Sequence, residues 1–166
     1  MLPESAWLAV QLLFLLVVAN GMPIIMKRML ADKGAWPVDG GWNLPLDGHP
    51  LLGKSKTWRG IVFALLGTGL ASVLMGWSFE LGVFTGLWAM VGDLFSSFIK
   101  RRLALPPSSM ALGLDQVPES LFPLWAMRSE WVLTPGFILA LVMAFLVLEL
   151  SLSRWLHKLQ IREQPY

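Results

Sequence analysis

The stretch Val91–Leu103 reads V-G-D-L-F-S-S-F-I-K-R-R-L, an apolar run that carries an aspartate and then ends in three cations. Asp93 lies inside a segment long enough to span a membrane, and a carboxylate at the centre of a span costs about 2.5–3.5 kcal/mol on insertion scales. Ionisable residues inside spans are usually functional. The rest of the sequence must therefore show whether this segment lies in a membrane.

The composition is that of an integral membrane protein. Of the 166 residues, 55% are hydrophobic and 14% are charged, and the mean hydropathy of +0.62 lies above the range of soluble domains. Cysteine is absent, which excludes disulfides, thiol catalysis and cysteine-based metal sites. His49 and His157 have no ligand spacing. The net charge of +2 is too small to argue from, and no nucleic-acid partner is expected.

The apolar runs predict one all-α membrane domain over residues 1–166 with five transmembrane helices. About twenty apolar residues cross a hydrocarbon core of roughly 30 Å. The predicted spans are residues 7–26, 58–77, 80–99, 115–131 and 132–152, and the long connections are residues 27–57 and 100–114. Gly82 and Gly86 form a G-x-x-x-G pair, which either lets a neighbouring helix approach closely or is scattered glycine.

The fourth span is the ambiguous one, because Pro118, Glu119 and Pro123 interrupt it, so this helix is predicted to be short. Positively charged loops tend to stay in the cytoplasm. If the fourth segment crosses the membrane, only Arg128 of the thirteen cations lies outside. If it does not cross, nine cations lie inside and four outside. With the crossing, the twelve cations on the inner side are Lys27, Arg28, Lys33, Lys54, Lys56, Arg59, Lys100, Arg101, Arg102, Arg154, Lys158 and Arg162. Five spans are favoured, with the N-terminus outside and with the C-terminus and both long loops on the cytoplasmic face of the cytoplasmic (inner) membrane.

Asp93 begins a row of polar side chains. Ser96 or Ser97, and then Lys100, follow at steps of three or four residues, so on a helix they share one face. A carboxylate, a hydroxyl and an ammonium group in line suit a hydrated Mg²⁺ with a phosphate beside it, because Mg²⁺ is often held by one or two carboxylates plus substrate phosphates. The alternative is an Asp–Lys pair with a structural role only.

The first long loop ends in G-H-P-L-L-G-K-S-K-T-W-R-G, residues 48–60. Glycines and cations that lead into a helix resemble a phosphate cradle, in which backbone N–H groups and a helix N-terminus meet an anion. The spacing is not that of a Walker A motif. Lys54, Lys56 and Arg59 are alternatively charges that only set the topology.

The second long loop ends in G-L-D-Q-V-P, residues 113–118. Asp115 is a second candidate metal ligand, and two carboxylates can hold one or two Mg²⁺ ions against a triphosphate. Alternatively, Asp115 is the N-cap of a short helix, a role compatible with the first. Asp39 is expected only to shape the turn P-V-D-G, and Arg102 only to mark the topology.

These motifs together resemble a known family. In order they are Asn20, P-V-D-G at 37–40, L-G-K-S-K-T-W-R-G at 52–60, G-D-L-F-S-S-F-I-K-R-R at 92–102 and L-D-Q-V-P at 114–118. This order resembles the CDP-archaeol synthase family of membrane CTP transferases, over about residues 20–119. The fragment S-F-I-K-R from Ser97 is similar to the start of the signature of the related CDP-diacylglycerol synthases. The sequence departs from those patterns after Arg101, where no Lys-Asp pair follows, and at Glu119, where archaeal members have an aromatic residue.

The resemblance implies a five-helix enzyme that transfers CMP from CTP to a membrane lipid phosphate and releases pyrophosphate, in phospholipid biosynthesis. Asp93 and Asp115 would hold the cofactor Mg²⁺, and Lys56 and Lys100 would be further catalytic residues. The residues implied to bind CTP are Lys54, Lys56, Thr57, Arg59, Ser97, Lys100 and Arg101. The implied partners are CTP, the lipid phosphate and membrane lipid, and a homodimer is left open. The competing hypothesis is a non-catalytic membrane protein that binds anionic lipid headgroups through its cytoplasmic basic loops.

Overall fold

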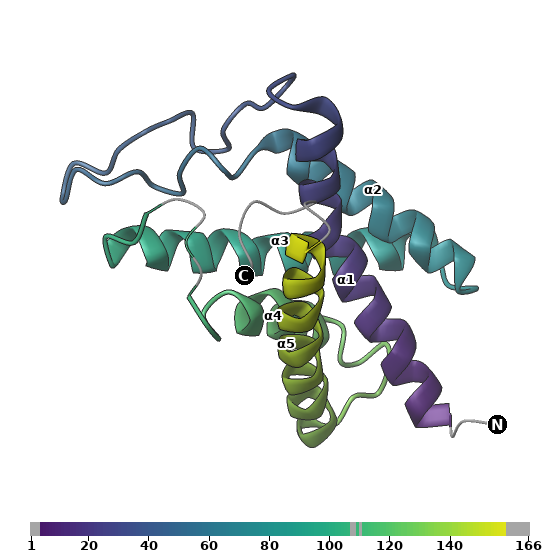
Figure 1. Ribbon diagram of the computed structural model, residues 1–166. Coiled ribbons are helices and arrows are strands. Elements are labelled where there is room, and N and C mark those ends of the chain that lie inside the picture. The colour runs from purple at the N-terminus through teal and green to yellow at the C-terminus, as the bar shows by residue number, and fades with distance from the viewer. Residues whose placement is uncertain (1–3, 107–108, 110, 159–166) are drawn as a thin grey trace.

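Five α-helices make up the protein in the computed structural model, which describes residues 4–106, 109 and 111–158 (Figure 1). Their bounds are α1 Glu4–Leu30, α2 Trp58–Leu74, α3 Phe79–Arg102, α4 Gln116–Ala126 and α5 Pro135–Lys158. The predicted all-α architecture with five helices is confirmed for this part of the chain. Arg162, one of the predicted cytoplasmic cations, lies outside the described residues, as do the side chains of His157 and Lys158.

Three helices, α1, α3 and α5, are long and apolar enough to cross a membrane. Helix α2 is apolar but has 17 residues. Helix α4 differs most from the prediction of a span over residues 115–131, because its 11 residues rise only about 16 Å at 1.5 Å per residue. Residues 127–133 leave the helix through a turn in which Val132 has a positive φ of 50°. Helix α4 alone is therefore too short to cross a hydrocarbon core.

Other boundaries also differ from the predicted ones. Helix α1 runs on to Leu30 and α3 to Arg102, so the predicted loops 27–57 and 100–114 begin only at residues 31 and 103. Hydropathy marks the apolar part of a helix, whereas backbone hydrogen bonding continues through polar residues. At the end of α3 the cations stay helical because their side chains reach carbonyl groups of the two loops, as described below.

The connections divide between two ends of the molecule. The rings of Trp77, in the α2–α3 turn, and Trp131, in the α4–α5 connection, lie 5.5 Å apart. Both pack against the buried cluster that joins α1, α4 and α5, and Leu8 and Ala9 near the start of α1 pack there too. Figure 1 shows the loop 31–57 leaving the opposite end of α1. Helix α3 thus carries the chain from one end to the other.

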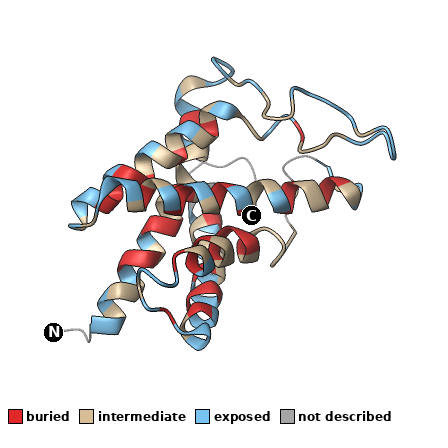
Figure 2. Cartoon of the chain, turned by 180° about the vertical axis from the view of Figure 1, so that it is seen from behind, coloured by how far each residue is buried: buried red, intermediate tan, exposed pale blue. Residues whose placement is uncertain are grey.

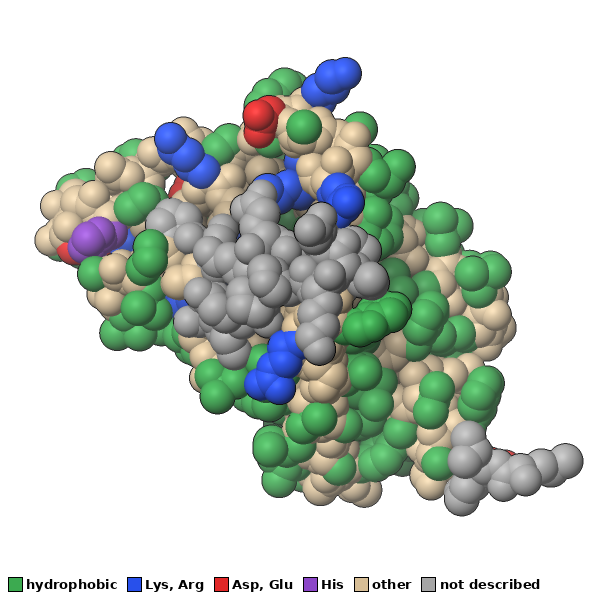
Figure 3. Space-filling model, viewed as in Figure 1, with side chains coloured by type: hydrophobic (Ala, Val, Ile, Leu, Met, Phe, Trp, Pro, Cys, Tyr) green, Lys and Arg blue, Asp and Glu red, His purple; other side chains and the backbone are tan. Residues whose placement is uncertain are grey.

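The helices keep many large apolar side chains on the outside. Leu70 is 61% exposed, Leu74 86%, Leu139 64% and Val147 61%. The buried faces form stripes along the helices (Figure 2). On the face in Figure 3, Lys and Arg side chains lie over the upper and central parts, and hydrophobic side chains cover most of the lower and right-hand parts. An apolar surface of this kind fits contact with lipid rather than water.

Glycines let the backbones of α3 touch its neighbours. A Cβ added at Gly82 would lie under 3.0 Å from the backbone of Thr68 in α2, and Gly86 packs on the Thr68 side chain. The predicted close approach of a helix to this G-x-x-x-G pair is thereby confirmed, and the neighbour is α2. A Cβ at Gly92 would come under 3.0 Å from the backbone of Pro118 and Glu119. The close contact at Gly92 places the start of α4 beside Asp93.

We expect Gly92→Ala to lower the free energy of unfolding by about 1–3 kcal/mol or more, because the new methyl group would collide with backbone that cannot rotate away. Thermal unfolding in detergent measures this. Gly21→Ala is the matched control, because no atom lies within 4 Å of a Cβ at Gly21; that variant should gain up to about 1 kcal/mol in helix propensity. Equal midpoints for the two variants would contradict the close α3–α4 contact.

Candidate active site

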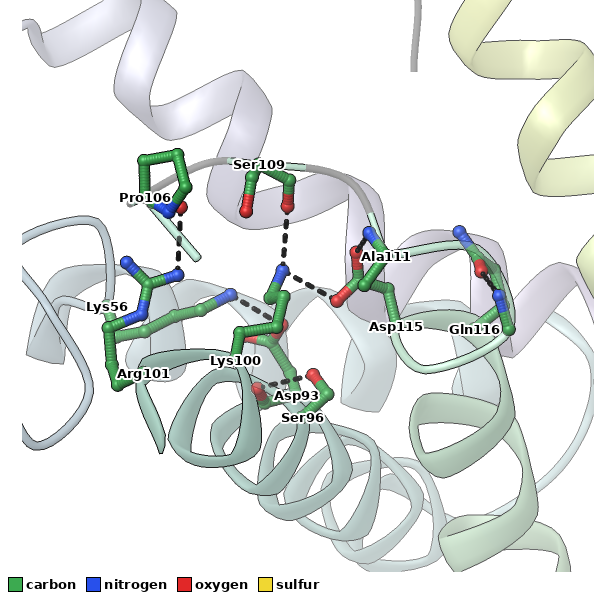
Figure 4. Close-up of polar contacts among 11 residues, drawn as sticks. Lys56, Asp93, Ser96, Lys100, Arg101, Pro106, Ser109, Ala111, Asp115 and Gln116 are labelled. Carbon is green, nitrogen blue, oxygen red and sulfur yellow. Dashed lines mark hydrogen bonds and ion pairs between the residues drawn. The ribbon is translucent and has the colours of Figure 1, made fainter. Parts of the chain in front are cut away.

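The polar groups gather around the last turns of α3 (Figure 4). Asp93 and Lys100 come from α3, Lys56 comes from the end of the loop 31–57, and Asp115 directly precedes α4. The side chains of these four residues point toward one another in the close-up. The structure therefore brings together the four residues that the sequence assigned to catalysis.

Two ion pairs link these residues. The Lys56 Nζ lies 2.5 Å from Asp93 Oδ1, with side-chain exposures of 22% and 17%. The Lys100 Nζ lies 2.6 Å from Asp115 Oδ1, with side-chain exposures of 9% and 16%. Asp93 thus has its ion pair with the loop residue Lys56, and not with Lys100 of its own helix.

Lys56 keeps its charge in this setting. Burial alone would lower the pKa of Lys56, but the Asp93 carboxylate beside it, with Glu119 and Asp115 nearby, raises that pKa above its ordinary value. The ammonium group is therefore protonated at neutral pH. A cation fixed next to a carboxylate at this position is available to an incoming phosphate.

Beside the ion pairs lie buried donors without partners. Arg101 is 3% exposed and donates from Nη2 to the Pro106 carbonyl at 3.0 Å, while its Nε and Nη1 have no partner. The Ser97 hydroxyl, one helical turn earlier, is 2% exposed and also lacks a partner. An unsatisfied buried donor costs about 1–3 kcal/mol, and more when the group is charged. An anion bound at this point would satisfy these donors.

The geometry decides two questions that the sequence left open. Ser96 donates from Oγ to the Asp93 carbonyl at 2.9 Å, so Ser97 is the serine whose hydroxyl is available. Asp115 is not a side-chain N-cap of α4, because it has helical dihedral angles and makes no cap hydrogen bond. Its Oδ2 instead accepts from the Ala111 N–H at 3.1 Å. The Asp115 carboxylate therefore faces the loop and Lys100.

The remaining predicted CTP-binding residues lie around the start of α2. Thr57 is the N-cap of α2, and its Oγ1 accepts from the Gly60 N–H at 3.2 Å. Arg59 donates to the carbonyls of Ala31 and Lys33, just beyond the end of α1. Lys54 is exposed. Contacts of these three side chains with CTP remain predictions, and Thr57 and Arg59 also hold the loop in place.

Asp39 has a larger role than the sequence suggested. Its Oδ1 accepts from the Gly41 N–H at 3.0 Å, and its Oδ2 accepts from the N–H groups of Leu52 and Gly53, each at 2.9 Å. These bonds pin the segment that precedes Lys54 and Lys56. The turn motif predicted the first contact, but nothing in the sequence indicated partners more than ten residues away.

Glu119 is the acidic residue that sequence reasoning did not assign to the site. It is 7% exposed, and its carboxyl group lies near that of Asp93. The signal for this placement is Gly92, which permits the contact of α3 with the backbone of Pro118 and Glu119. The acidic side of the site is thus formed by Asp93, Asp115 and Glu119.

We expect Asp39→Asn to loosen the loop and to cost about 1–3 kcal/mol, because hydrogen bonds to a carboxylate are stronger than those to an amide. Burial would raise the pKa of Asp39, but its bonds from the N–H groups of Gly53, Leu52 and Gly41 hold it below the ordinary value of 3.8. A depressed pKa stabilises the fold above the unfolded-state value, and the stabilisation is lost as the pH falls through the folded-state value. The gap between the unfolding midpoints of wild type and variant should therefore shrink from about pH 6 to about pH 3. A gap that does not change with pH would contradict this role.

Comparison with known proteins gives a consistent picture. The model of the family described as CarS-like CDP-archaeol synthase matches residues 7–166. The CDP-archaeol synthase of Hyperthermus butylicus is 31% identical over 157 residues, which cover 89% of both chains. That of Pyrococcus furiosus is 39% identical over 110 residues, or 59% of this chain and 60% of its own.

A solved structure shares the fold. It is described as an intramembrane enzyme for archaeal membrane lipids biosynthesis, and it is 30% identical to this chain with a TM-score of 0.68. The match covers 82% of this chain and 89% of that one. The chain therefore belongs to the CDP-archaeol synthase family, and it is an integral membrane enzyme of the CTP-dependent cytidylyltransferase class.

Proposed function

We propose that this enzyme uses Mg²⁺ to transfer CMP from CTP to an isoprenoid glycerol ether phosphate at the cytoplasmic face of the cytoplasmic membrane. The observation that carries the proposal is the group of buried donors without partners, Arg101 Nε, Arg101 Nη1 and Ser97 Oγ, beside two cations that are paired with carboxylates. Such a group suits an anion with several phosphates. The choice of an ether lipid rests on the names of the relatives.

The reaction needs positioning and charge neutralisation more than covalent help from the protein. An oxygen of the lipid phosphate attacks the α-phosphorus of CTP and forms a new P–O bond. The bond between the α-phosphorus and the bridging oxygen breaks, and pyrophosphate leaves with that electron pair. Lys56, Lys100 and Arg101 would neutralise the charge of the phosphates during this exchange. A protein nucleophile is not required.

The carboxylates fit the proposed Mg²⁺. Asp93 and Asp115 offer oxygen ligands, and each already has a cation as its partner. The described residues contain no cluster of three acidic or histidine ligands for a metal. Substrate phosphates would therefore supply further ligands of the proposed Mg²⁺, an ion that is often held by one or two carboxylates together with substrate phosphates. When bound, Mg²⁺ would supply charge neutralisation and orientation of the triphosphate.

The proposed orientation puts the N-terminus outside and the active site at the cytoplasmic boundary. The contact of Trp77 with Trp131 supports the placement of the α2–α3 and α4–α5 connections at one end. The polar loops and the cationic end of α3 lie at the other. The choice of the cytoplasmic end rests on the positive charges of the loops. In this arrangement α4 and the residues after it return the chain across the membrane, and the lipid chains stay in the bilayer while the phosphate reaches Lys56.

We expect Asp93→Asn to abolish pyrophosphate release from CTP, Mg²⁺ and an isoprenoid glycerol ether phosphate, with a fall of at least about 10²-fold in kcat/KM. The loss follows because the amide cannot hold either Mg²⁺ or the Lys56 ammonium in the same way. Glu80→Gln is the matched control, an exposed acid in the first turn of the same helix. Retained activity in Asp93→Asn would remove Asp93 from the mechanism.

The competing hypothesis, a protein that only binds anionic headgroups, is tested by moving one charge. Ser55→Lys combined with Lys56→Ser keeps the composition but takes the ammonium group away from Asp93. The enzyme hypothesis predicts a loss of about 10²-fold or more in turnover. Binding to vesicles of anionic lipid should change little, because that depends on total charge. Unchanged turnover in this variant would favour the headgroup-binding hypothesis.

A further inference from the structure

We propose that Arg102 is a positioning residue, which anchors the loop 31–57 on α3 in the arrangement in which Lys56 reaches Asp93. The anchoring role rests on contacts within the protein, and its effect on the reaction rests on the proposed function. From its motif, Arg102 was expected only to mark the topology. The structure instead gives it more contacts with the first loop than any other described residue of the last turn of α3 has.

Arg102 binds a single turn of that loop, at residues 47–50. Its Nη1 lies 3.0 Å from both carboxylate oxygens of Asp47. Its Nη2 donates to the Pro50 carbonyl at 2.6 Å and to the His49 carbonyl at 3.4 Å. The guanidinium also stacks on the Phe98 ring, 5.2 Å from its centroid, which fixes the side chain from the α3 side. The two terminal nitrogens of one guanidinium thus hold a carboxylate and two backbone carbonyls, and such charge-assisted bonds fix a geometry as well as adding energy.

A continuous set of backbone contacts joins this anchor to Lys56. The bridge between Asn43 and Pro50 closes the turn that Arg102 binds. The segment that follows is held by Asp39, as described above. Lys56 itself accepts at its carbonyl from the Val38 N–H at 2.9 Å. Displacement of the turn at residues 47–50 would therefore act on the segment that carries Lys56.

The three cations at the end of α3 divide their contacts between the two loops. Lys100 donates to the Ser109 carbonyl at 3.0 Å and pairs with Asp115, and Arg101 donates to the Pro106 carbonyl. These three contacts hold the second loop. Arg102 holds the first loop instead. One helical turn thus fixes both loops relative to Asp93, which is on the same helix.

The consequence for catalysis is an effect on binding. If the loop is released, only a fraction of the molecules has Lys56 on Asp93, and the apparent affinity for CTP falls by that fraction. Turnover at saturating CTP changes little, because bound CTP shifts the population back to molecules in which Lys56 contacts Asp93. A positioning role therefore predicts a change in KM for CTP with nearly constant kcat.

The absence of cysteine from the chain makes a direct test of the loop possible. Leu46, next to the turn that Arg102 binds, is 90% exposed. A nitroxide label on Leu46→Cys therefore reports the motion of this turn, and no native cysteine has to be removed. We expect Arg102→Gln and Asp47→Asn each to make the label more mobile, and to raise KM for CTP about tenfold with kcat within about twofold. The exchange of charges in Asp47→Arg with Arg102→Asp should recover part of both losses.

Arg128→Gln is the matched control. Arg128 makes the same kinds of contact, a bond to the Trp125 carbonyl and a stack on the Trp125 ring, but after α4. The Arg128→Gln variant should leave the mobility of the Leu46 label and the KM for CTP unchanged. An unchanged label spectrum in Arg102→Gln, or a fall in kcat at constant KM, would overturn the positioning role. The spectra require neither CTP nor lipid. If the label becomes more mobile in Arg102→Gln but the wild type does not turn over CTP, the proposed function is refuted and the anchoring role of Arg102 stands.

Discussion

The ion pair between Lys56 and Asp93 is the contact on which the rest of the site depends. A carboxylate near the end of a membrane-spanning helix needs a compensating charge, because ions lose their hydration there. The compensating ammonium group comes from a loop 37 residues away in the sequence. That loop must therefore hold one conformation. Asp39, Arg59 and Arg102 each bind its backbone, and Thr57 fixes the point at which it becomes α2.

The second constraint is the close approach of helices at glycine. Gly82 and Gly86 bring α3 onto α2, so that the start of α2, with Lys56 just before it, is held against α3. Gly92 brings α4 onto α3 and places Glu119 beside Asp93. Two close helix–helix contacts, both made at glycines of α3, thus set the distances between the charged groups. The unpartnered donors of Arg101 and Ser97 lie in the same region, which fits a site built for an anion.

The sequence predicted the helices and their number because a membrane requires long apolar runs and keeps most cations out of them. It also predicted Asp93, Asp115, Lys56 and Lys100 as one group, through their motifs and through the prediction that all of them lie at the same side of the membrane. It did not predict which acid pairs with which cation, because pairing depends on the path of the loop. The bonds of Asp39 to Leu52 and Gly53, and those of Arg102 to His49 and Pro50, involve backbone atoms, which leave no mark on residue type. The length of α4 was overestimated because its apolar residues continue into a turn that is not helical.

The proposed reaction joins CMP to a lipid phosphate at this site. The most direct measurement follows the phosphorus atoms of CTP with purified protein, Mg²⁺ and an isoprenoid glycerol ether phosphate, with a diacylglycerol phosphate in a parallel reaction. With CTP labelled at the α-phosphorus, the label should pass into the lipid phase in step with release of unlabelled pyrophosphate, and more readily with the ether lipid. Label that stays in water-soluble products with either lipid would contradict the proposed reaction.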